Sequence, residues 1–460
     1  NQKGGIIYQG AITLDSCEVF SNTVAASLAD SGGLIGWKPN KAYIYNTNIY
    51  NNTAPTGTIL YDCASATILS SNIYGNTASS VGGLFYKVNA DIISSNLYNN
   101  EATDGGVFYQ STINIANSDI YGNSSNDDGA VAMNSSLTLN NVDVYENSAA
   151  SRGIFMYGNV RVYDSEIRNN TVAHSIFNGA DSYLSSVKIY NNSSSGDEGV
   201  FGGGSSTIIN GLIYGNSAVD TEVFHQGQHK LVNTTAIASS NLYSDTDGSA
   251  SLTAYNSILY GEFVAGDTDY FDSLSLNYCA LSTDNIPAQA EQDSCLAGIT
   301  EVEFLDFNKN VYSLNAGSVL IDGGSDALWS THGDGVTSDL AGNNRIFGAA
   351  IDIGCYEVVN ELSLFDLDSG SELYTDDQVI GITVGNDSGA SAWLVSESRP
   401  TIPVEDDLLW QTSRPSRYTL KNDNHGRKTV YLWTKFEDGS VNPVRAAGTI
   451  YLDTLAPQLS

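Results

Sequence analysis

The sequence predicts an all-β protein, with a parallel β-helix over most of the chain and a β-sandwich near its end. A motif of the form Asn-Ile-Tyr-Gly-Asn-Thr-Ala returns every 22 to 24 residues through the first half of the chain. A glycine followed by two apolar residues returns in phase with it. Units this short cannot each enclose a core, so they must stack, with strands of successive units pairing in parallel. After residue 360 the repeat is lost, and short alternating strands predict a separate domain.

The tyrosine of this motif defines the first column of the repeat. Successive residues of a strand face opposite sides, so the apolar residue before each tyrosine should point inward and the tyrosine outward. The exposed rings either stack on one another or offer a strip for a sugar chain or a partner protein. The inward column is Ile49, Ile73, Leu97, Ile120, Val144, Ile167, Ile189 and Ile213. The outward column, a candidate ligand-binding surface, is Tyr50, Tyr74, Tyr98, Tyr121, Tyr145, Arg168, Tyr190 and Tyr214.

Asparagine and glycine columns accompany the tyrosines. Asparagine tolerates unusual backbone angles at turns and can hydrogen-bond to its counterparts above and below, so we expect a structural ladder. The glycine column precedes apolar pairs such as Leu84 and Phe85, and the sequence leaves open which of the two faces the core. The asparagine column is Asn52, Asn76, Asn100, Asn123, Asn147, Asn170, Asn192 and Asn216.

The composition excludes several classes of partner. Asp and Glu number 52 against 19 Lys and Arg, which gives a net charge of -33. This charge argues against binding nucleic acid, and against anionic lipid or acidic glycan without a bridging divalent cation. An acidic, lysine-poor surface suits an extracellular setting, where structural calcium is a possible cofactor, although dispersed carboxylates also serve solubility alone. The chain has no run of 18 apolar residues, so no membrane-spanning helix is expected.

Five cysteines cannot all pair with one another. Cys279 and Cys295 close a short loop outside the regular repeats, so the sequence predicts a disulfide between them. Cys17, Cys63 and Cys355 are expected to fill interior positions as small apolar residues.

Candidate catalytic and metal sites are weak in this sequence. The run Asn126-Asp127-Asp128 precedes a glycine and is interpreted as a turn, so no catalytic residue is assigned. His225 and His229 would stand roughly 13 Å apart along a strand, too far to share one zinc ion. Acidic pairs in loops are the candidate calcium ligands: Asp245 with Asp247, and Asp366 with Asp368.

The repeat resembles the right-handed parallel β-helix repeats of bacterial surface proteins, including the polymorphic outer membrane protein group. That group carries Phe-x-x-Asn where this chain carries Tyr-x-Asn. A second resemblance lies within residues 266–358 and begins with the runs Asn277-Tyr278-Cys279, Phe304-Leu305-Asp306 and Tyr312-Ser313-Leu314. It links these and the runs Gly317 to Gly324, Asp339 to Arg345 and Ile351-Asp352-Ile353-Gly354-Cys355-Tyr356-Glu357 to the C-terminal segment of secreted bacterial β-helix proteins. The resemblance implies a terminal cap in which Arg345, Asp352 and Glu357 satisfy the exposed edge of the last coil.

Residues 361–460 hold Trp393, Trp410 and Trp433 on short alternating strands, which suits an immunoglobulin-like sandwich. The runs from Lys428 to Trp433 and from Thr449 to Pro457 resemble the Ig-like modules of large bacterial extracellular proteins, in which an Asp-Thr-x-Ala-Pro element joins one module to the next. This resemblance and the start of the chain beside a repeat lead us to expect a piece of a longer protein with further modules.

The sequence therefore predicts three parts: β-helix repeats at 1–265, terminal coils and cap at 266–358, and an Ig-like sandwich at 361–460. The expected function is that of a non-enzymatic extracellular protein, an adhesin or stalk segment at the cell surface that binds a glycan or a protein ligand. The alternative is a polysaccharide lyase or glycoside hydrolase of the β-helix type. The constant repeat spacing leaves little chain to wall a catalytic cleft, which favours the first function.

Overall fold

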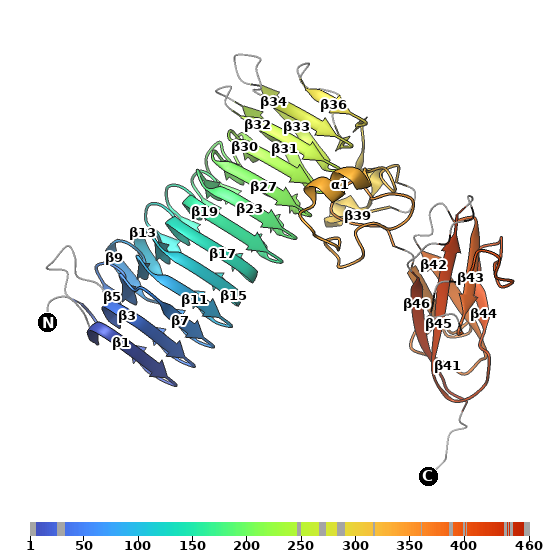
Figure 1. Ribbon diagram of the computed structural model, residues 1–460, viewed down its shortest axis with the longest axis horizontal. Coiled ribbons are helices and arrows are strands. Elements are labelled where there is room, and N and C mark those ends of the chain that lie inside the picture. The colour runs from blue at the N-terminus through green and yellow to red at the C-terminus, as the bar shows by residue number, and fades with distance from the viewer. Residues whose placement is uncertain are drawn as a thin grey trace, which may run out of the picture. The chain divides into compact units, whose positions relative to one another are not determined.

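The protein is described by a computed structural model that divides into two compact units, 1–299 with 327–335, and 300–326 with 336–460. In the first unit, short strands stack in successive coils (Figure 1). The residues described are 6–24, 33–245, 250–265, 273–282, 290–315, 318–359, 361–385, 390–398, 401, 403–436, 439, 441 and 445–454.

Each coil repeats the same short strands, and equivalent strands of successive coils pair in parallel. In one coil these are β10 (Phe85–Tyr86), β11 (Asn89–Ile93), β12 (Asn96–Tyr98) and β13 (Glu101–Asp104). Phe85 pairs with Leu60 and Phe108, and Leu97 pairs with Ile73 and Ile120. The predicted parallel β-solenoid is therefore confirmed.

The strands of the first unit fall into four positions in each coil, which we name a to d in chain order. Position a holds β6 (Leu60–Tyr61), β10, β14 (Phe108–Tyr109), β22 (Phe177–Asn178), β26 (Phe201–Gly202) and β29 (Thr221–His225). Position b holds β7 (Ala66–Leu69), β11, β23 (Asp181–Ser185), β27 (Ser205–Ile209), β30 (Gln228–Val232), β32 (Ser251–Tyr255), β34 (Ser273–Asn277) and β36 (Glu291–Asp293).

Position c holds β2 (Glu18–Phe20), β4 (Asn48–Tyr50), β8 (Asn72–Tyr74), β12, β20 (Glu166–Arg168), β24 (Lys188–Tyr190), β28 (Leu212–Tyr214), β35 (Ala280–Leu281) and β37 (Leu296–Ala297). Position d holds β5 (Thr53–Ala54), β9 (Thr77–Val81), β13, β16 (Ser124–Ser125), β18 (Ser148–Ala149), β21 (Thr171–Val172) and β25 (Ser193–Ser194). Longer strands run through more than one position: β1 (Ile7–Asp15), β3 (Gly36–Tyr45), β15 (Thr112–Tyr121), β17 (Ala132–Tyr145), β19 (Phe155–Tyr163), β31 (Thr235–Asp245) and β33 (Ile258–Ala265).

Single residues with left-handed backbone angles bend the chain between strands. In one coil these are Lys87 (φ 55°), Ser94 (φ 50°) and Asn99 (φ 53°). The corner after position c is occupied by Asn99 in this coil and by Gly122 (φ 63°) in the next, both residue types that adopt this region readily. Asparagine and glycine therefore recur after the tyrosine because a corner lies there.

The core lies inside the coils and contains the predicted apolar column. Every residue of the column from Ile49 to Ile213 is fully buried. Both members of the Leu84 and Phe85 pair are also buried, since Leu84 precedes the strand and only Phe85 lies on it. Phe85 stacks on Phe108 with ring centroids 5.5 Å apart. The question that the sequence left open is thus answered by the bend before position a, which lets two adjacent side chains face inward.

The asparagine column forms the predicted ladder. Asn100 is fully buried, and its Oδ1 accepts hydrogen bonds from the backbone N–H and the side-chain Nδ2 of Asn76, each at 3.0 Å. Its Nδ2 donates to the carbonyl of Ile73 and to Oδ1 of Asn123, each at 2.9 Å. Each asparagine therefore joins three successive coils.

We expect Asn100→Ala to destabilise the protein by about 2 kcal/mol, because it leaves buried partners on Asn76 and Ile73 without their hydrogen bonds. Urea unfolding measures the loss. The matched control is Asn99→Gly at the neighbouring exposed corner, where glycine suits the left-handed angles and stability should change little. Equal unfolding midpoints for the two variants would contradict a structural role for the ladder.

The predicted disulfide between Cys279 and Cys295 is wrong for this structure, in which all five cysteines carry free thiols. The two residues occupy equivalent places in successive coils, since the following residues Ala280 and Leu296 pair in parallel. Cys295 Sγ accepts a hydrogen bond from the Cys279 backbone N–H at 3.4 Å, and the Cys279 thiol donates to the carbonyl of Asn277. Each thiol is thus satisfied within the coils. Cys63 and Cys355 are buried as expected, whereas Cys17 is half-buried.

The first part of the second unit is small and irregular. It holds η1 (Glu301–Glu303), β38 (Phe304–Asp306), η2 (Phe307–Lys309) and β39 (Val311–Leu314), with β38 and β39 antiparallel. The helix α1 (Asp326–His332) follows, and residues 327–335 belong to the first unit. There the His332 ring stacks on Tyr255 at 4.2 Å, and Lys230 donates to His332 Nδ1 at 3.3 Å.

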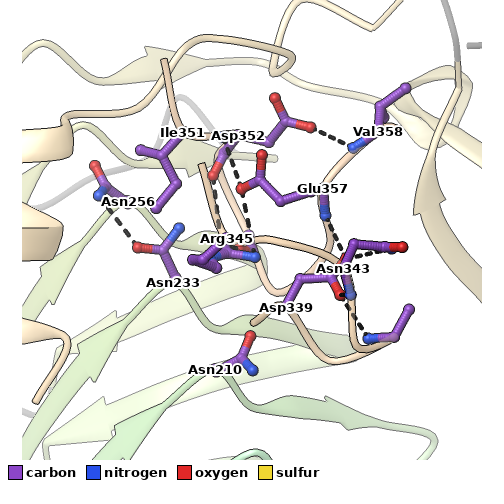
Figure 2. Close-up of polar contacts among 12 residues, drawn as sticks. Asn210, Asn233, Asn256, Asp339, Asn343, Arg345, Ile351, Asp352, Glu357 and Val358 are labelled. Atoms are coloured by element: carbon purple, nitrogen blue, oxygen red, sulfur yellow. Dashed lines mark hydrogen bonds and ion pairs between the residues drawn. The ribbon is translucent and has the colours of Figure 1, made fainter. Parts of the chain in front are cut away.

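Arg345 lies buried among acidic residues of the second unit (Figure 2). Its Nη1 stands 3.6 Å from Glu357 Oε1, and its Nη2 donates to the carbonyls of Gly354 and Asp352. Asp352 in turn accepts hydrogen bonds from the backbone N–H groups of Asp322 and Val358, both at 2.7 Å. The residues that the sequence assigned to a cap therefore form one buried polar network.

Burial raises the pKa of Asp352 to about 7. An unfolded aspartate has a pKa of about 3.9, so the protonated form adds stability that is complete below pH 4 and is lost as the pH rises to 7. We expect Asp352→Asn to reduce the loss by about 1.4 kcal/mol for each pH unit in that window, while the part that comes from Glu357, whose pKa is also raised by burial, remains. Hydrogen exchange of peptides from residues 318–358 between pH 4 and 8 measures it. The control Asp368→Asn, at an exposed carboxylate, should follow the unaltered protein, and a parallel profile for Asp352→Asn would contradict the assignment.

The C-terminal part of the second unit contains two small sheets around an apolar core. One sheet has the order β40 (Glu361–Phe365), β42 (Val379–Gly385) and β44 (Arg417–Thr419), all antiparallel. The other has the order β41 (Tyr374–Thr375), β46 (Ala446–Leu452), β45 (Gly426–Lys435) and β43 (Ala392–Ser396). Leu364, Ile382, Val430 and Ile450 are buried together between them. Among the described residues, no helix has the length and apolar character needed to cross a membrane.

Candidate functional site: the outer faces of the coils

The predicted tyrosines form a stacked file on position c. Their rings are half-buried, and each lies nearly parallel to the next. Centroids are 4.9 Å apart for Tyr50 and Tyr74, and 4.8 Å apart for each following pair as far as Tyr145. Phe20, which the sequence analysis did not include, extends the file with a centroid 5.1 Å from that of Tyr50.

Arg168 replaces a tyrosine in the file on position c and contacts the ring of Tyr145 in its place. Its guanidinium carbon stands 4.2 Å from the Tyr145 ring centroid, a cation–π distance. The guanidinium also lies 3.6 Å from Asp143 Oδ2 and 3.6 Å from Glu166 Oε2. Tyr190 resumes the file by donating its hydroxyl to Glu166 Oε2 at 2.7 Å and stacking on Tyr214 at 5.1 Å. The arginine therefore takes the place of a ring.

This stacking limits what the file can bind. Each ring from Tyr50 to Tyr121 has another ring against both of its faces, so the faces are covered and the edges with their hydroxyls point outward. Burial, and next the neighbouring phenol, raise the pKa of Tyr98 and of Tyr121. The hydroxyls thus stay protonated at neutral pH and serve as hydrogen-bond donors and acceptors.

A second aromatic file lies on position a, and the sequence analysis missed it. It consists of Trp37, Tyr61, Tyr86 and Tyr109, with successive ring centroids 5.9, 4.8 and 5.6 Å apart. The signal was available in the tyrosine that follows Phe85 and Phe108. The tyrosine directly follows an apolar pair, so the alternation of the strand is masked at this position.

This second file explains why a further glycine stands directly before the glycine column in two coils, at Gly82 and Gly105. A Cβ at Gly105 would stand 2.6 Å from Cδ2 of Tyr109, and one at Gly82 would stand 2.4 Å from Cδ2 of Tyr86. Both glycines also have positive φ, at 66° and 102°. Each ring therefore packs flat over the glycine four residues before it, where any side chain would displace it.

Further along, the same column of position a becomes polar. His225 pairs in register with Gly202, and Gly202 pairs with Asn178. Glu198 occupies the space that Gly202 leaves, and its Oε2 accepts from Asn178 Nδ2 at 3.1 Å and from Ser175 Oγ at 3.2 Å. Its Oε1 stands 3.8 Å from His225 Nδ1. This cluster joins three coils, with Glu198 bonded to Asn178 and Ser175, and with His225 close to it but without a hydrogen bond to its Nδ1 among the described residues.

The candidate metal ligands are placed as follows. Asp366 is buried, and its carboxylate accepts hydrogen bonds from the backbone of Asp368, from the backbone and hydroxyl of Ser369, and from the hydroxyl of Thr375. Asp247 and the side chain of Asp245 lie outside the described residues. Within the part of the chain that the structure describes, no group of three or more His, Cys, Asp or Glu side chains is arranged to hold a metal ion.

His229 and Asp128, which the sequence analysis considered as candidate site residues, form contacts between coils. His229 is buried and interacts with Ser206 Oγ at 2.8 Å and the carbonyl of Gln226 at 2.5 Å, and burial lowers its pKa to about 4. Asp128 accepts a hydrogen bond from the backbone of Arg152 at 3.1 Å. Both therefore hold the coils together.

These features define the class of the molecule as a parallel β-solenoid with aromatic files on its outer faces. No family model, no curated protein and no solved structure matches the chain. Its function must therefore be inferred from the geometry of its own surfaces.

Replacing Tyr121 by alanine should lower stability by about 1–2 kcal/mol, because the variant loses ring stacking against both Tyr98 and Tyr145. Tyr121→Phe keeps both contacts and serves as the matched control. Denaturant unfolding of the two variants measures the difference. If both variants unfold together with the unaltered protein, the file contributes nothing to the stacking of coils.

Proposed function

We propose that this protein is a non-enzymatic segment of an extracellular surface protein that attaches to cell-surface glycans through the outer faces of its coils. The observation that carries the proposal is the continuity of the tyrosine file. Five tyrosines from Tyr50 to Tyr145 place one phenol on each of five successive coils at nearly constant spacing. Such an array presents a repeating row of hydroxyl edges, and a polysaccharide is itself a repeating row of hydroxyl groups.

The regularity of the coils supports the same proposal. Parallel pairing and the asparagine ladder hold equivalent residues of successive coils in register, so a binding residue that recurs in the sequence recurs at constant spacing along the unit. A lengthwise ligand gains contacts from several coils at once, which raises its overall affinity although each contact is weak.

The wider setting belongs to this proposal. The right-handed form of the β-helix, the bacterial cell surface and the kinship with polymorphic outer membrane protein repeats follow from the resemblance of the motifs. The two C-terminal sheets are in keeping with an Ig-like module, and such modules are joined in series in longer extracellular chains. Structural calcium is retained as a possible cofactor, with Asp366 and Asp368 as the described candidates.

Polysaccharide cleavage is the competing function, and one observation favours it. Asp104, Asp127 and Asp128 lie near one another, and burial, followed by the charge of Asp127, raises the pKa of Asp104. A carboxyl group with a raised pKa is the form that a general acid requires. Asp128 accepts a hydrogen bond from the Arg152 backbone and pairs with its guanidinium, which argues that these aspartates form a structural turn and not a catalytic site.

A retention experiment with a cleavage assay separates the two functions. We expect the unaltered protein to be retained on cell-surface glycans without releasing reducing sugar from mixed polysaccharides. Replacing Tyr98, Tyr121 and Tyr145 together by serine should reduce retention at least tenfold, because three adjacent contacts are removed. The control replaces the same three residues by phenylalanine, which keeps the stacking and tests the hydroxyls separately. Reducing-sugar release would establish the enzymatic function, and unchanged retention of the serine variant would exclude the tyrosine file.

A further inference from the structure

We propose that a polar pocket on the outer face of β7, β11 and β15 binds a hexose unit of a neutral polysaccharide. This inference rests on the proposed glycan attachment and gives it a second site, distinct from the tyrosine file on position c. The pocket has a volume of about 270 Å³ and draws its lining from three successive coils. Its polar side chains are Ser65, Asn89, Asp91, Thr112 and Asn114, and three alanines complete the lining.

The pocket follows from strand alternation at position b. Ala66, Ala90 and Ile113 are buried, while their neighbours on either side face outward. Parallel register places Asn89 beside Thr112 and Asp91 beside Asn114. Strand spacing of roughly 4.8 Å makes the lining of three coils roughly 10 Å long, which suits a short stretch of sugar chain lying along the coils.

The lining has the chemistry of a sugar site. Asp91 Oδ1 accepts a hydrogen bond from Asn114 Nδ2 at 2.8 Å, which fixes the two side chains against each other. An ionised carboxylate accepts about four hydrogen bonds, so Asp91 retains the capacity to bind two sugar hydroxyls. The hydroxyls of Ser65 and Thr112 and the amide of Asn89 add groups that both donate and accept. Among the described residues, the lining contains no aromatic or large apolar side chain, so a ligand here would be held by hydrogen bonds, which a hydroxyl-rich sugar supplies.

Charge restricts the ligand to a neutral sugar. Asp91 would repel a uronate carboxylate, and the chain as a whole carries a net charge of -33. The lysines at the corner before position b are already engaged. Lys38 lies 2.9 Å from Asp62 Oδ2, and Lys87 Nζ stands 5.1 Å from the Tyr86 ring centroid. Neither supplies a dedicated partner for an acidic group. Lys41, directly before the paired Ala42, lies one coil outside the lining on the side away from Thr112 and Asn114.

Large side chains end the row of short polar side chains beyond Thr138, toward the C-terminal coils. The column that contains Asp91 and Asn114 continues in register through Thr138 to Arg161 and Tyr183. Arg161 stands 5.9 Å from the Tyr183 ring centroid, and the Tyr183 hydroxyl donates to Asp334 from the segment after α1. A lengthwise sugar chain therefore has room over the coils up to Thr138 and meets a barrier beyond it.

The test compares Asp91→Ala/Asn114→Ala with Thr138→Ala, which changes the same column one coil beyond the pocket. The full chain is run in affinity gels that contain a neutral glucan, a neutral mannan, a neutral xylan or polygalacturonate. We expect retardation by at least one neutral polysaccharide, a loss of affinity of at least tenfold in the double variant, and a change within twofold for Thr138→Ala. Both altered side chains of the double variant are exposed, and an unchanged unfolding midpoint verifies the fold.

Three results would overturn the pocket. They are equal retardation of the double variant and the unaltered protein, retardation by polygalacturonate alone, and no retardation by any neutral polysaccharide. Retention on cell-surface glycans is measured in parallel. It shows whether the pocket alone is wrong or whether the proposed glycan attachment is wrong as well. If the double variant and the unaltered protein are equally retarded in the gels and are both retained on cell-surface glycans, glycan attachment stands and the pocket is excluded. If the unaltered protein is retained nowhere, both proposals fail.

Discussion

Parallel pairing in strict register is the constraint on which this molecule depends. Because Leu97 pairs with Ile73 and Ile120, every position of the repeat lies beside its counterpart, and similar side chains must tolerate close contact with one another. Asparagines meet this condition by hydrogen-bonding in series, aromatic rings by stacking, and aliphatic residues by filling the core. Charged residues meet it poorly, which accounts for Arg168 being held by Asp143 and Glu166 where it replaces a ring.

The same constraint shapes the outer surface. On position c the tyrosine faces are used in stacking, so only edges and hydroxyls remain for a ligand. On position b the outward side chains are short and polar near Asp91, so a shallow pocket forms there. The two faces therefore have different chemistry, although both arise from one repeat. A solenoid built in this way can change the chemistry of one outer face by substitutions in one column while the backbone stays the same.

Much of the fold was predictable because residues at the same place in successive repeats become neighbours in the structure. The inward direction of Ile73 and the outward direction of Tyr74 follow from strand alternation, and the ladder at Asn100 follows from the recurrence of asparagine at a turn. The missed features depend on bends. Leu84 and Phe85 are both buried because the chain turns before position a, and the file of Tyr61, Tyr86 and Tyr109 was hidden behind that apolar pair. The disulfide was wrongly predicted because a short sequence separation cannot show what each thiol bonds to; in the structure the Cys279 thiol donates to the carbonyl of Asn277 and the Cys295 thiol to that of Leu276.

The sequence by itself determined the parallel solenoid, its core column and its asparagine ladder, since a short repeat can bury apolar surface only by stacking on itself. It also identified Arg345, Asp352 and Glu357 as a group. Only the tertiary structure decided that the tyrosine faces are covered, that the rings of the second file lie over Gly82 and Gly105, and that Asp91 and Asn114 share a pocket. The physical reason is that the period fixes which residues become neighbours, whereas the corners between strands fix which way their side chains point.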